Sequence, residues 1–351
     1  MPAVSIHSAT IEWSLSGLSF DPLAELLTGL SPASPEDVAA SSTKVRLELR
    51  PSPPEAAADP RDEGWVPAFF HGIVEAHRSE SGFLVWDRAS RVFIPRDGGV
   101  IDARIATPEQ EVVRGSLKSV LQVSFALALR LQAGLFHLHA AALVLASGVP
   151  VFVVGESGAG KTSTTLALLE GPPGGRGADY LGDDTLYLTR AAPPGAEPGG
   201  DALHVVAFPR EFHIGDSTLA SVPRLGPLLG PLPHYGTKRP LDARLAYPGR
   251  FRPYLSLARD EKRALALFPT VAAGAPATEV VPLARAEAFG RFLGSSGAIV
   301  VEGIPGRDEN LALLSALLGA VRCYEVRLGT DALADPAKAI AERVAQLEGR
   351  A

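Results

Sequence analysis

The sequence feature that most limits the fold is a pair of apolar runs that leads directly into a glycine-rich loop. The runs cover residues 136–145 and 149–154, and only Ala146-Ser147-Gly148 separates them. Such a short connection suits an antiparallel hairpin and is too short for the crossover that parallel neighbours need. The second run continues into the loop, residues 155–162, and residues 162–169 then have a helix-forming composition. This order predicts an α/β chain built on a sheet of mixed strand direction.

The glycine-rich loop fits the pattern Gly-x-x-x-x-Gly-Lys-Ser/Thr in full. Its residues are Gly155, Glu156, Ser157, Gly158, Ala159, Gly160, Lys161 and Thr162, followed by Ser163. Glycines let backbone N–H groups curl around phosphate oxygens, and the next helix adds the positive end of its dipole. Lys161 is predicted to reach the β- and γ-phosphates, and the Thr162 hydroxyl to bind Mg²⁺. The alternative is a glycine-rich connection with an accidental lysine, which the flanking strand and helix argue against.

An acidic pair, Asp183-Asp184, follows Tyr180-Leu181-Gly182 and precedes a predicted strand over residues 185–188. Adjacent side chains at a strand end point in different directions. One carboxylate can therefore face Mg²⁺ while the other accepts the proton of an attacking hydroxyl group. Taken alone, such a pair is more often a solvated acidic turn. Beside a complete phosphate loop we interpret it as catalytic.

Two histidines, His137 and His139, lie two residues apart on the predicted strand before the loop strand. That spacing places both side chains on one face. Structural, half-buried histidines are the usual explanation for each one alone. His139 is the better functional candidate because it lies nearer the loop strand. A metal site is not expected, because the pattern offers no third ligand.

A proline-rich stretch over residues 224–263 carries an excess of Lys and Arg over Asp and Glu. Prolines at positions 227, 231, 233, 240, 248 and 253 forbid long regular elements. One interpretation is a mobile basic lid, with Lys238 and Arg239, that clamps phosphates or an acidic substrate. A solvated surface loop is the alternative. Arg210, just after a predicted strand, is a further candidate for the charge that faces the phosphates.

The chain is expected to have three parts. Residues 1–106 predict a β-rich module for partner recognition, because short apolar or alternating runs are separated by turn-rich pieces. Residues 107–134 predict a connecting helix that begins at Thr107-Pro108 and ends at Gly134. Residues 135–351 form the domain with the phosphate loop. Its other strands are expected over residues 185–188, 203–208, 265–268, 280–282, 298–302 and 323–328, and its late helices over 308–318 and 335–347.

Composition narrows the function classes. The net charge of −6 gives no basic face for nucleic acid or an anionic membrane, so neither partner is expected. The single cysteine, Cys323, allows no intramolecular disulfide, and residues 1–13 lack the pattern of a secretory signal. The apolar stretch over residues 140–154 is too short and too interrupted to cross a bilayer. We therefore expect a cytoplasmic protein.

Together, His139, the loop Gly-Glu-Ser-Gly-Ala-Gly-Lys-Thr and Leu181-Gly182-Asp183-Asp184 resemble the catalytic domain of bacterial HPr kinase/phosphorylase. The resemblance is sharp over residues 139–188 and extends in outline over 136–328. It implies a fold similar to phosphoenolpyruvate carboxykinase, in which a hairpin leads into the phosphate loop. It also implies that Asp183 is the base, that Asp184 helps to hold Mg²⁺ and that His139 lines the site. The family's hexamers imply a homo-oligomer.

The chain departs from this family at two places. Where the family has an Arg-Pro-Gly-Arg segment, this chain has Phe268-Pro269-Thr270-Val271-Ala272-Ala273-Gly274, without arginine. Dephosphorylation by inorganic phosphate is therefore not expected. The first hundred residues also lack the family's own N-terminal motifs. Diverged relatives phosphorylate precursor peptides of ribosomally made natural products, so an HPr-like protein and such a peptide both stay open as acceptor.

These observations predict a kinase that uses ATP and Mg²⁺ to phosphorylate a serine of a small protein or peptide. Lys161, Asp183 and His139 are its expected catalytic residues, and Thr162 and Asp184 its expected metal ligands. Two alternatives stay open from the sequence. One is a regulatory protein that senses ATP without transferring phosphate. The other is a kinase of a small hydroxyl-bearing metabolite.

Overall fold

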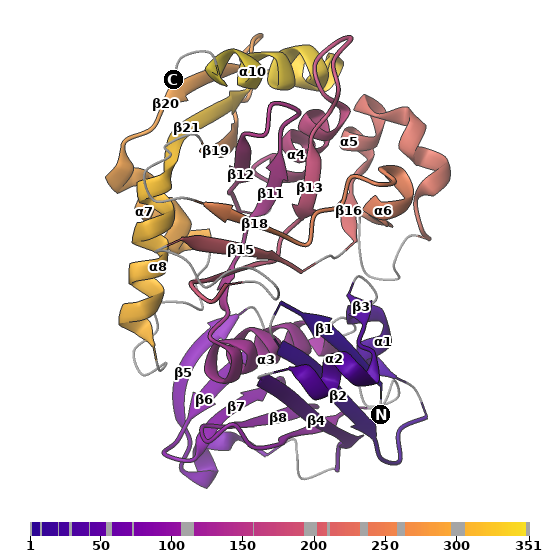
Figure 1. The fold of residues 1–351 in the computed structure, drawn as a ribbon, viewed down its shortest axis with the longest axis vertical. Helices are drawn as coiled ribbons and strands as arrows, with labels where there is room; N and C mark the ends of the chain where they lie inside the picture. The colour runs from indigo at the N-terminus through magenta and orange to yellow at the C-terminus, as the bar shows by residue number, and fades with distance from the viewer. Residues whose placement is uncertain are drawn as a thin grey trace. The chain divides into compact units, whose positions relative to one another are not determined.

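The computed structural model divides the chain into two compact units, which Figure 1 shows in indigo to purple and in magenta to yellow. The first consists of Met1–His137 together with residues 306–311, and most of the remaining chain forms the second. The structure describes all residues except 1, 8, 20, 28–29, 42, 54–57, 72–73, 107–115, 157, 193–201, 209–210, 232–237, 258–263, 296–305 and 349–351. No helix in the described part of the chain is long and apolar enough to cross a membrane.

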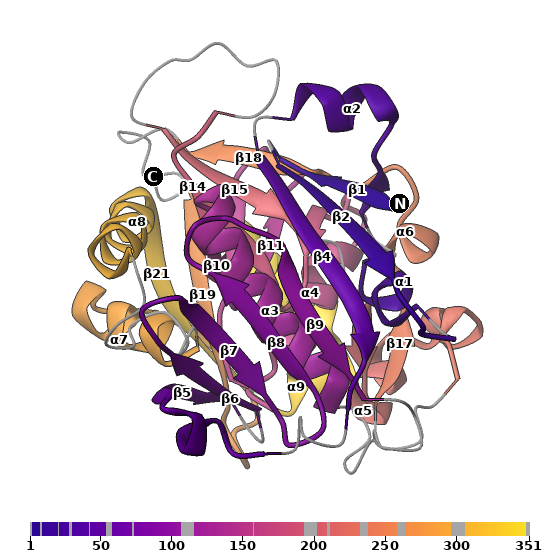
Figure 2. The ribbon, with the colours of Figure 1, turned by 90° about the horizontal axis from the view of Figure 1, so that it is seen from below.

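A nine-stranded sheet forms the body of the first unit (Figure 2). Its strands follow the order β3-β1-β2-β4-β9-β8-β7-β6-β5. β2, β4 and β9 pair in parallel, and the other neighbours are antiparallel. The β-rich character expected for this part of the chain is therefore observed. The bounds are β1 Ala3–Ile6, β2 Ala9–Leu15, β3 Ser31–Pro32, β4 Thr43–Pro51, β5 Val66–His71, β6 Val74–Arg78, β7 Gly82–Trp86, β8 Arg91–Pro95 and β9 Ile101–Ile105.

Helix α3 (Ser116–Ala133) packs against this sheet, over β4, β6, β7 and β8. It ends as the sequence predicts, because Gly134 has a φ of +64 and stops the helix. Its expected start at residues 107–108 lies outside the described residues. The helix is more than a connection, since it buries Val120, Leu121 and Leu129. Short helical segments also belong to this unit: α1 Pro22–Leu26, α2 Pro35–Ala40 and η2 Pro60–Glu63.

A six-stranded mixed sheet in the order β13-β11-β12-β19-β21-β20 forms the core of the second unit. β11 and β12 make the predicted antiparallel hairpin, and β12, β19 and β21 pair in parallel. All four residues of β11 and three of the four in β12 are buried, because the sheet is covered on both faces. The bounds are β11 Ala141–Val144, β12 Pro150–Val153, β13 Asp179–Gly182, β19 Ala264–Val271, β20 Glu279–Pro282 and β21 Val321–Leu328.

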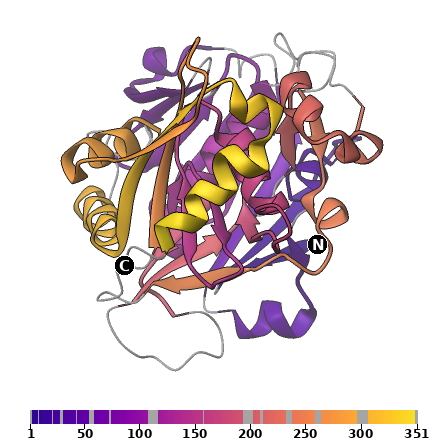
Figure 3. The same cartoon turned by 90° about the horizontal axis from the view of Figure 1, so that it is seen from above.

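Helix α4 (Lys161–Glu170) and the C-terminal helical segments cover the sheet; the latter appear in yellow in Figure 3. Leu166 and Leu169 of α4 share one buried cluster with Ile340 and Val344. The helix predicted over residues 308–318 is observed as α8 (Arg307–Ala320). The one predicted over 335–347 is a succession of α9 (Asp331–Ala334), the π-helical turn η5 (Ala337–Glu342) and α10 (Arg343–Glu348). Helix α7 (Arg285–Ser295) was not predicted, and the strand expected over 298–302 lies outside the described residues.

The apolar run before the loop strand is two strands, not one. β10 (Phe136–Leu138) belongs to a sheet in the order β10-β14-β15-β18, whereas β11 belongs to the six-stranded sheet. The chain bends at residues 139–140 between the two strands. The expectation that His137 and His139 lie on one face of a single strand is therefore wrong. The other strands of the smaller sheets are β14 Leu186–Thr189, β15 Leu203–Ala207, β18 Tyr254–Leu257, and the pair β16 Phe212–Ile214 and β17 Arg239–Leu241.

The proline-rich stretch is not a basic lid in its described part. It forms the turn η3 (Pro223–Leu228), β17, the short helix α6 (Ala243–Ala246) and β18. Prolines exclude long elements but not these short ones, and Leu225 and Leu241 are fully buried. Three of its described arginines form ion pairs: Arg224 with Glu170, Arg252 with Asp179, and Arg244 with Asp242 within the stretch itself. Packing and neutralised charge hold this stretch against the core.

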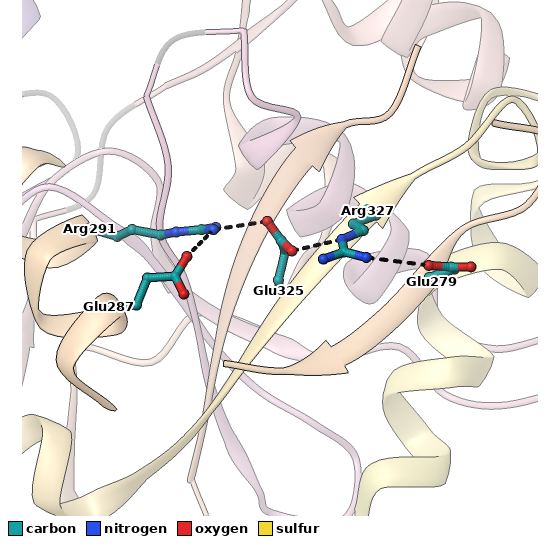
Figure 4. A network of polar contacts seen from close by, with 5 residues as sticks. All are labelled: Glu279, Glu287, Arg291, Glu325 and Arg327. Atoms are coloured by element: carbon teal, nitrogen blue, oxygen red, sulfur yellow. Dashed lines mark hydrogen bonds and ion pairs between the residues drawn. The ribbon is translucent and has the colours of Figure 1, made fainter. Parts of the chain in front are cut away.

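A chain of ion pairs ties α7 to β20 and β21 (Figure 4). Arg291 donates to Glu287 at 2.7 Å and to Glu325 at 2.9 Å. Arg327 donates to the other Glu325 oxygen at 2.8 Å and lies 3.7 Å from Glu279. The hydrogen bond from Arg291, with help from Arg327, lowers the pKa of Glu325 against the opposing effect of burial. These contacts fix the outer strand of the sheet rather than a site.

Candidate functional site

The loop between β12 and α4 has the backbone that phosphate binding requires. Gly158 and Gly160 have φ of +84 and +97, values that side-chain-bearing residues rarely adopt. Gly160 also approaches the end of β21, because a Cβ built on it would clash with the Leu328 side chain. The loop then enters the ten-residue helix α4 directly at Lys161. A helix N-terminus of this kind presents backbone donors and a positive dipole end to an anion.

Three residues singled out in the sequence meet at the start of α4. The Lys161 ammonium group lies 3.1 Å from His139 Nε2 and forms an ion pair with Asp184 Oδ1. His139 Nε2 is 3.9 Å from the same carboxylate oxygen. An ammonium group only donates hydrogen bonds, so Nε2 of His139 accepts and the proton of the neutral ring lies on Nδ1. The bend after β10, the loop helix and the turn after β13 thus converge on one lysine, whose side chain is 7% exposed.

The two aspartates occupy different environments. Asp183 is 2% exposed, whereas the Asp184 side chain is 38% exposed and faces the lysine. Asp184 also has a φ of +65, and the backbone N–H of Thr185 donates to the Asp183 carbonyl oxygen at 2.8 Å. This tight turn directs the neighbouring side chains apart. Left-handed backbone at a residue other than glycine is stored strain that often marks a functional site.

The phosphate loop forms part of a cavity with a volume of about 560 Å³. Polar side chains come from the loop, from α5 (Asp216–Ser221), from β16, and from positions that follow β10, β13 and β21 or precede β17: His139, Glu156, Lys161, Thr162, Ser163, Asp184, His213, Ser217, Thr218, Ser221, Lys238 and Thr330. Apolar side chains come from the ends of β19 and β21 and from the segments that follow these strands: Val271, Ala272, Ala273, Leu328, Ala332, Leu333, Pro336 and Ile340. We call this second set the apolar wall. The volume lies in the range of small-molecule sites.

Most of the predicted site residues line this cavity, and some do not. Gly158, Gly160, Thr162, Ser163 and Lys238 belong to its lining. Asp183 is outside the lining, so its role as the base stays a prediction. Gly155 and Ala159 pack on each other below the loop, since a Cβ on Gly155 would lie 3.2 Å from that of Ala159.

Among the remaining cationic candidates, Arg239 is described and is not in the lining. Arg239 donates to the carbonyl oxygens of Gly230 at 2.9 Å and Leu229 at 3.0 Å, which makes it a structural residue of the β17 turn. Arg210 and Ser157 lie outside the described residues. Lys238 and Lys161 therefore supply the cationic side chains in the described lining of the cavity.

The described residues contain no group of three or more His, Cys, Asp or Glu placed to hold a metal ion. They therefore give no support for a metal site built from protein side chains alone. Mg²⁺ in phosphoryl-transfer sites is usually held by one or two side chains and by the phosphates themselves. Thr162 and Asp184 line the same cavity and supply the oxygen donors that Mg²⁺ prefers. They fit that mode, and their role as ligands stays a prediction.

Two parts of the cavity were missed in the sequence. Helix α5 contributes hydroxyl groups, and Thr218 Oγ1 lies 2.9 Å from Ser163 Oγ. No motif marks this short helix. The second part is the apolar wall. From the sequence, only residues 268–274 of this region were considered, and only because that segment lacks arginine. Its exposed aliphatic residues become meaningful only when the fold places them beside the phosphate loop.

Comparison with known proteins adds little. No family model matches the chain, and no curated protein matches it. Among solved structures, the chain is similar to the Hpr(Ser) kinase/phosphatase from Coxiella burnetii, at 12% sequence identity and a TM-score of 0.27. The match covers 61% of this chain and 99% of that one. A TM-score this low does not establish a shared fold.

Proposed function

We propose that this chain is a kinase that transfers the γ-phosphoryl group of ATP to a serine hydroxyl of a small protein or peptide. The observation that carries the proposal is the convergence of Lys161, His139 and Asp184 beside a complete phosphate loop in one cavity. A loop of this kind binds a triphosphate, and a carboxylate next to its lysine suits transfer of a phosphoryl group to a hydroxyl.

The residues of the site have separate tasks in this proposal. The loop N–H groups and the start of α4 bind the phosphates, and the Lys161 ammonium group neutralises charge on them. Thr162 and Asp184 would hold Mg²⁺, which neutralises negative charge on the phosphates when bound. A triphosphate and Asp184 both attract the Lys161 ammonium group. Nucleotide binding therefore weakens the Lys161–Asp184 ion pair and makes that carboxylate available.

The base that accepts the serine proton is one of the two aspartates. The resemblance of the sequence favours Asp183, and the exposure of Asp184 to the cavity favours Asp184. Asparagine at either position keeps the side-chain volume and removes the proton acceptor. Replacing the base by asparagine should lower kcat by more than about 100-fold and leave the affinity for ATP unchanged. The aspartate that only holds Mg²⁺ should instead show a loss that higher Mg²⁺ partly restores.

The direct test is phosphoryl transfer from γ-labelled ATP in the presence of Mg²⁺. The acceptors are HPr, serine-containing peptides and the same peptides with Ser→Ala at the acceptor position. Lys161→Ala, Asp183→Asn and Asp184→Asn serve as controls. Label on the serine peptide alone, lost in Lys161→Ala and in at least one Asp→Asn variant, supports the proposal. Label transfer that survives all three substitutions rules the assignment out. Tight ATP binding without transfer to any acceptor would indicate a regulatory protein instead.

We further propose that the first unit recognises the acceptor. It carries a surface groove of about 420 Å³ that includes Trp65, Phe93 and Arg91. The Trp65 and Phe93 rings meet edge to face at 5.9 Å, and Arg91 makes a bidentate pair with Glu63. All three side chains are half-buried, and aromatic and arginine side chains in such grooves are typical anchors for peptides. Trp65→Ala should raise KM for the acceptor without changing KM for ATP, and an equal change in both constants would contradict this role.

A further inference from the structure

The apolar wall of the cavity contains aliphatic side chains that the fold leaves uncovered. Val271 is 63% exposed and Leu333 is 58% exposed, and both line the cavity. Leu328, Ala332 and Ile340 provide a buried floor around them. Exposed aliphatic residues scattered singly need no explanation, but a set gathered in a cavity indicates a ligand surface.

This wall is continuous with the phosphate loop. Leu328 contacts the loop at Gly160, where a Cβ would clash with its side chain. The Ala272 N–H donates to the Leu328 carbonyl oxygen at 2.9 Å, which joins the segment after β19 to the segment after β21. Leu333 is joined to α5 by the Ser221 hydroxyl, which donates to its carbonyl oxygen at 3.1 Å. A ligand held by its phosphates at the loop therefore has the apolar wall within the same cavity.

Hydrogen bonds inside the protein already use many backbone donors of the wall and of the residues next to it in the chain. The carboxylate of Asp331 accepts from the Thr278 N–H at 3.0 Å and from its hydroxyl at 2.6 Å, and that hydroxyl accepts from the Gly329 N–H at 3.1 Å. The other engaged N–H groups belong to Ala272, Ala275, Thr330, Ala332 and Leu333. These donors connect the segments of the wall to each other and to their neighbours and are not directed at a ligand.

We propose that the apolar wall binds the purine base and ribose of the nucleoside triphosphate and recognises them by shape and apolar contact. This inference rests on the proposed function for the position of the phosphates. Adenine and guanine differ in the hydrogen-bonding groups on their edges and share the same planar apolar faces. The wall's side chains are aliphatic, the neighbouring Thr330 hydroxyl donates to the Pro276 carbonyl oxygen at 3.4 Å, and several nearby backbone donors are engaged, so the wall discriminates weakly between the two bases. The site should therefore have little preference between the two nucleotides, and ATP and GTP should bind with similar affinity.

Calorimetric titration of the full chain with three ligands, each with Mg²⁺, tests this assignment. ATP and GTP report on the whole site, and inorganic tripolyphosphate reports on the phosphate loop alone. The variants are Val271→Ala and Leu333→Ala, with Leu245→Ala as the control. Leu245 is 67% exposed on α6 of the same unit and is outside the cavity lining.

The wild-type affinities for ATP and GTP should agree within about tenfold. Each wall variant should weaken ATP binding about 3- to 10-fold and leave the affinity for tripolyphosphate unchanged, because it removes apolar contact only. The control should change neither. A preference above tenfold, unchanged ATP affinity in both wall variants, or an equal loss for tripolyphosphate would each overturn the inference.

These results are independent of phosphoryl transfer. If the expected binding is observed but no acceptor is phosphorylated, the base subsite is supported and the kinase proposal is wrong. If tripolyphosphate and ATP bind equally well, the base subsite is wrong and phosphate binding by the loop is supported. If none of the ligands binds, both proposals are wrong.

Discussion

The left-handed backbone at Asp184 allows a test of the site's geometry that needs no substrate. A φ of +65 costs an ordinary L-residue about 1–2 kcal/mol and costs glycine nothing. The Asp184 carboxylate is 38% exposed and pairs with the largely buried Lys161. Asp184→Ala and Asp184→Gly remove the same ion pair, but only alanine keeps a Cβ on the strained backbone.

The difference between the two variants isolates the backbone strain. Losing the partly exposed ion pair destabilises both by about 1 kcal/mol. Alanine also bears the full cost of the left-handed conformation, whereas glycine loses about 0.4–1 kcal/mol through the greater freedom of its unfolded chain. The glycine variant should therefore be more stable than the alanine variant by about 1 kcal/mol. For a unit of this size that is about 2–4 °C in Tm.

Scanning calorimetry without added nucleotide measures both variants. Ser315 in the interior of α8 provides the control, because it is exposed on a helical backbone of the same unit, at which glycine should be less stable than alanine by about 1 kcal/mol. The sign of the Gly-minus-Ala difference should thus reverse between the two positions. Equal signs at Asp184 and Ser315 would refute the left-handed turn at Asp184.

Three further predictions concern the loop, the ion pairs and the proline-rich stretch. Gly160→Ala should weaken ATP binding more than tenfold in a calorimetric titration, because alanine rarely adopts a φ of +97 and its Cβ would displace the Leu328 side chain beside the loop. Affinity within twofold of wild type would contradict this. Glu325→Gln should lower the free energy of unfolding by about 1 kcal/mol at pH 7. Because the folded-state pKa of Glu325 is lowered, its contribution is present above about pH 4.3 and is lost as pH falls through the folded value. A difference from wild type that stays constant between pH 3 and 7 would exclude the charge as its cause, and the more exposed Glu287→Gln is the control. Tyr247→Phe should cost about 1–2 kcal/mol in urea unfolding by removing the 2.7 Å hydrogen bond to Glu170, and no change would favour a loosely held stretch.

Local sequence patterns predicted the elements whose geometry depends on a few consecutive residues. The hairpin β11–β12 follows from a connection too short for any other link, and the phosphate loop from glycines at fixed spacing before Lys161. The end of α3 at Gly134 is of the same kind. Helix α7 escaped prediction, although Ala288 and Phe292 of that helix are fully buried, because so short an apolar face gives a weak periodic signal.

The sequence by itself determined that a phosphate loop follows a hairpin and that His139 and an aspartate pair accompany it. Only the tertiary structure decided that Asp184 lines the cavity and pairs with Lys161 while Asp183 is buried outside the lining, because the left-handed backbone at Asp184 directs the two side chains apart. It also decided that Arg239 is structural and that the apolar wall lies beside the loop. Residues far apart along the chain make these contacts. Spacing within a motif carries no information about them, since the packing of β19, β21 and the C-terminal helices creates the wall.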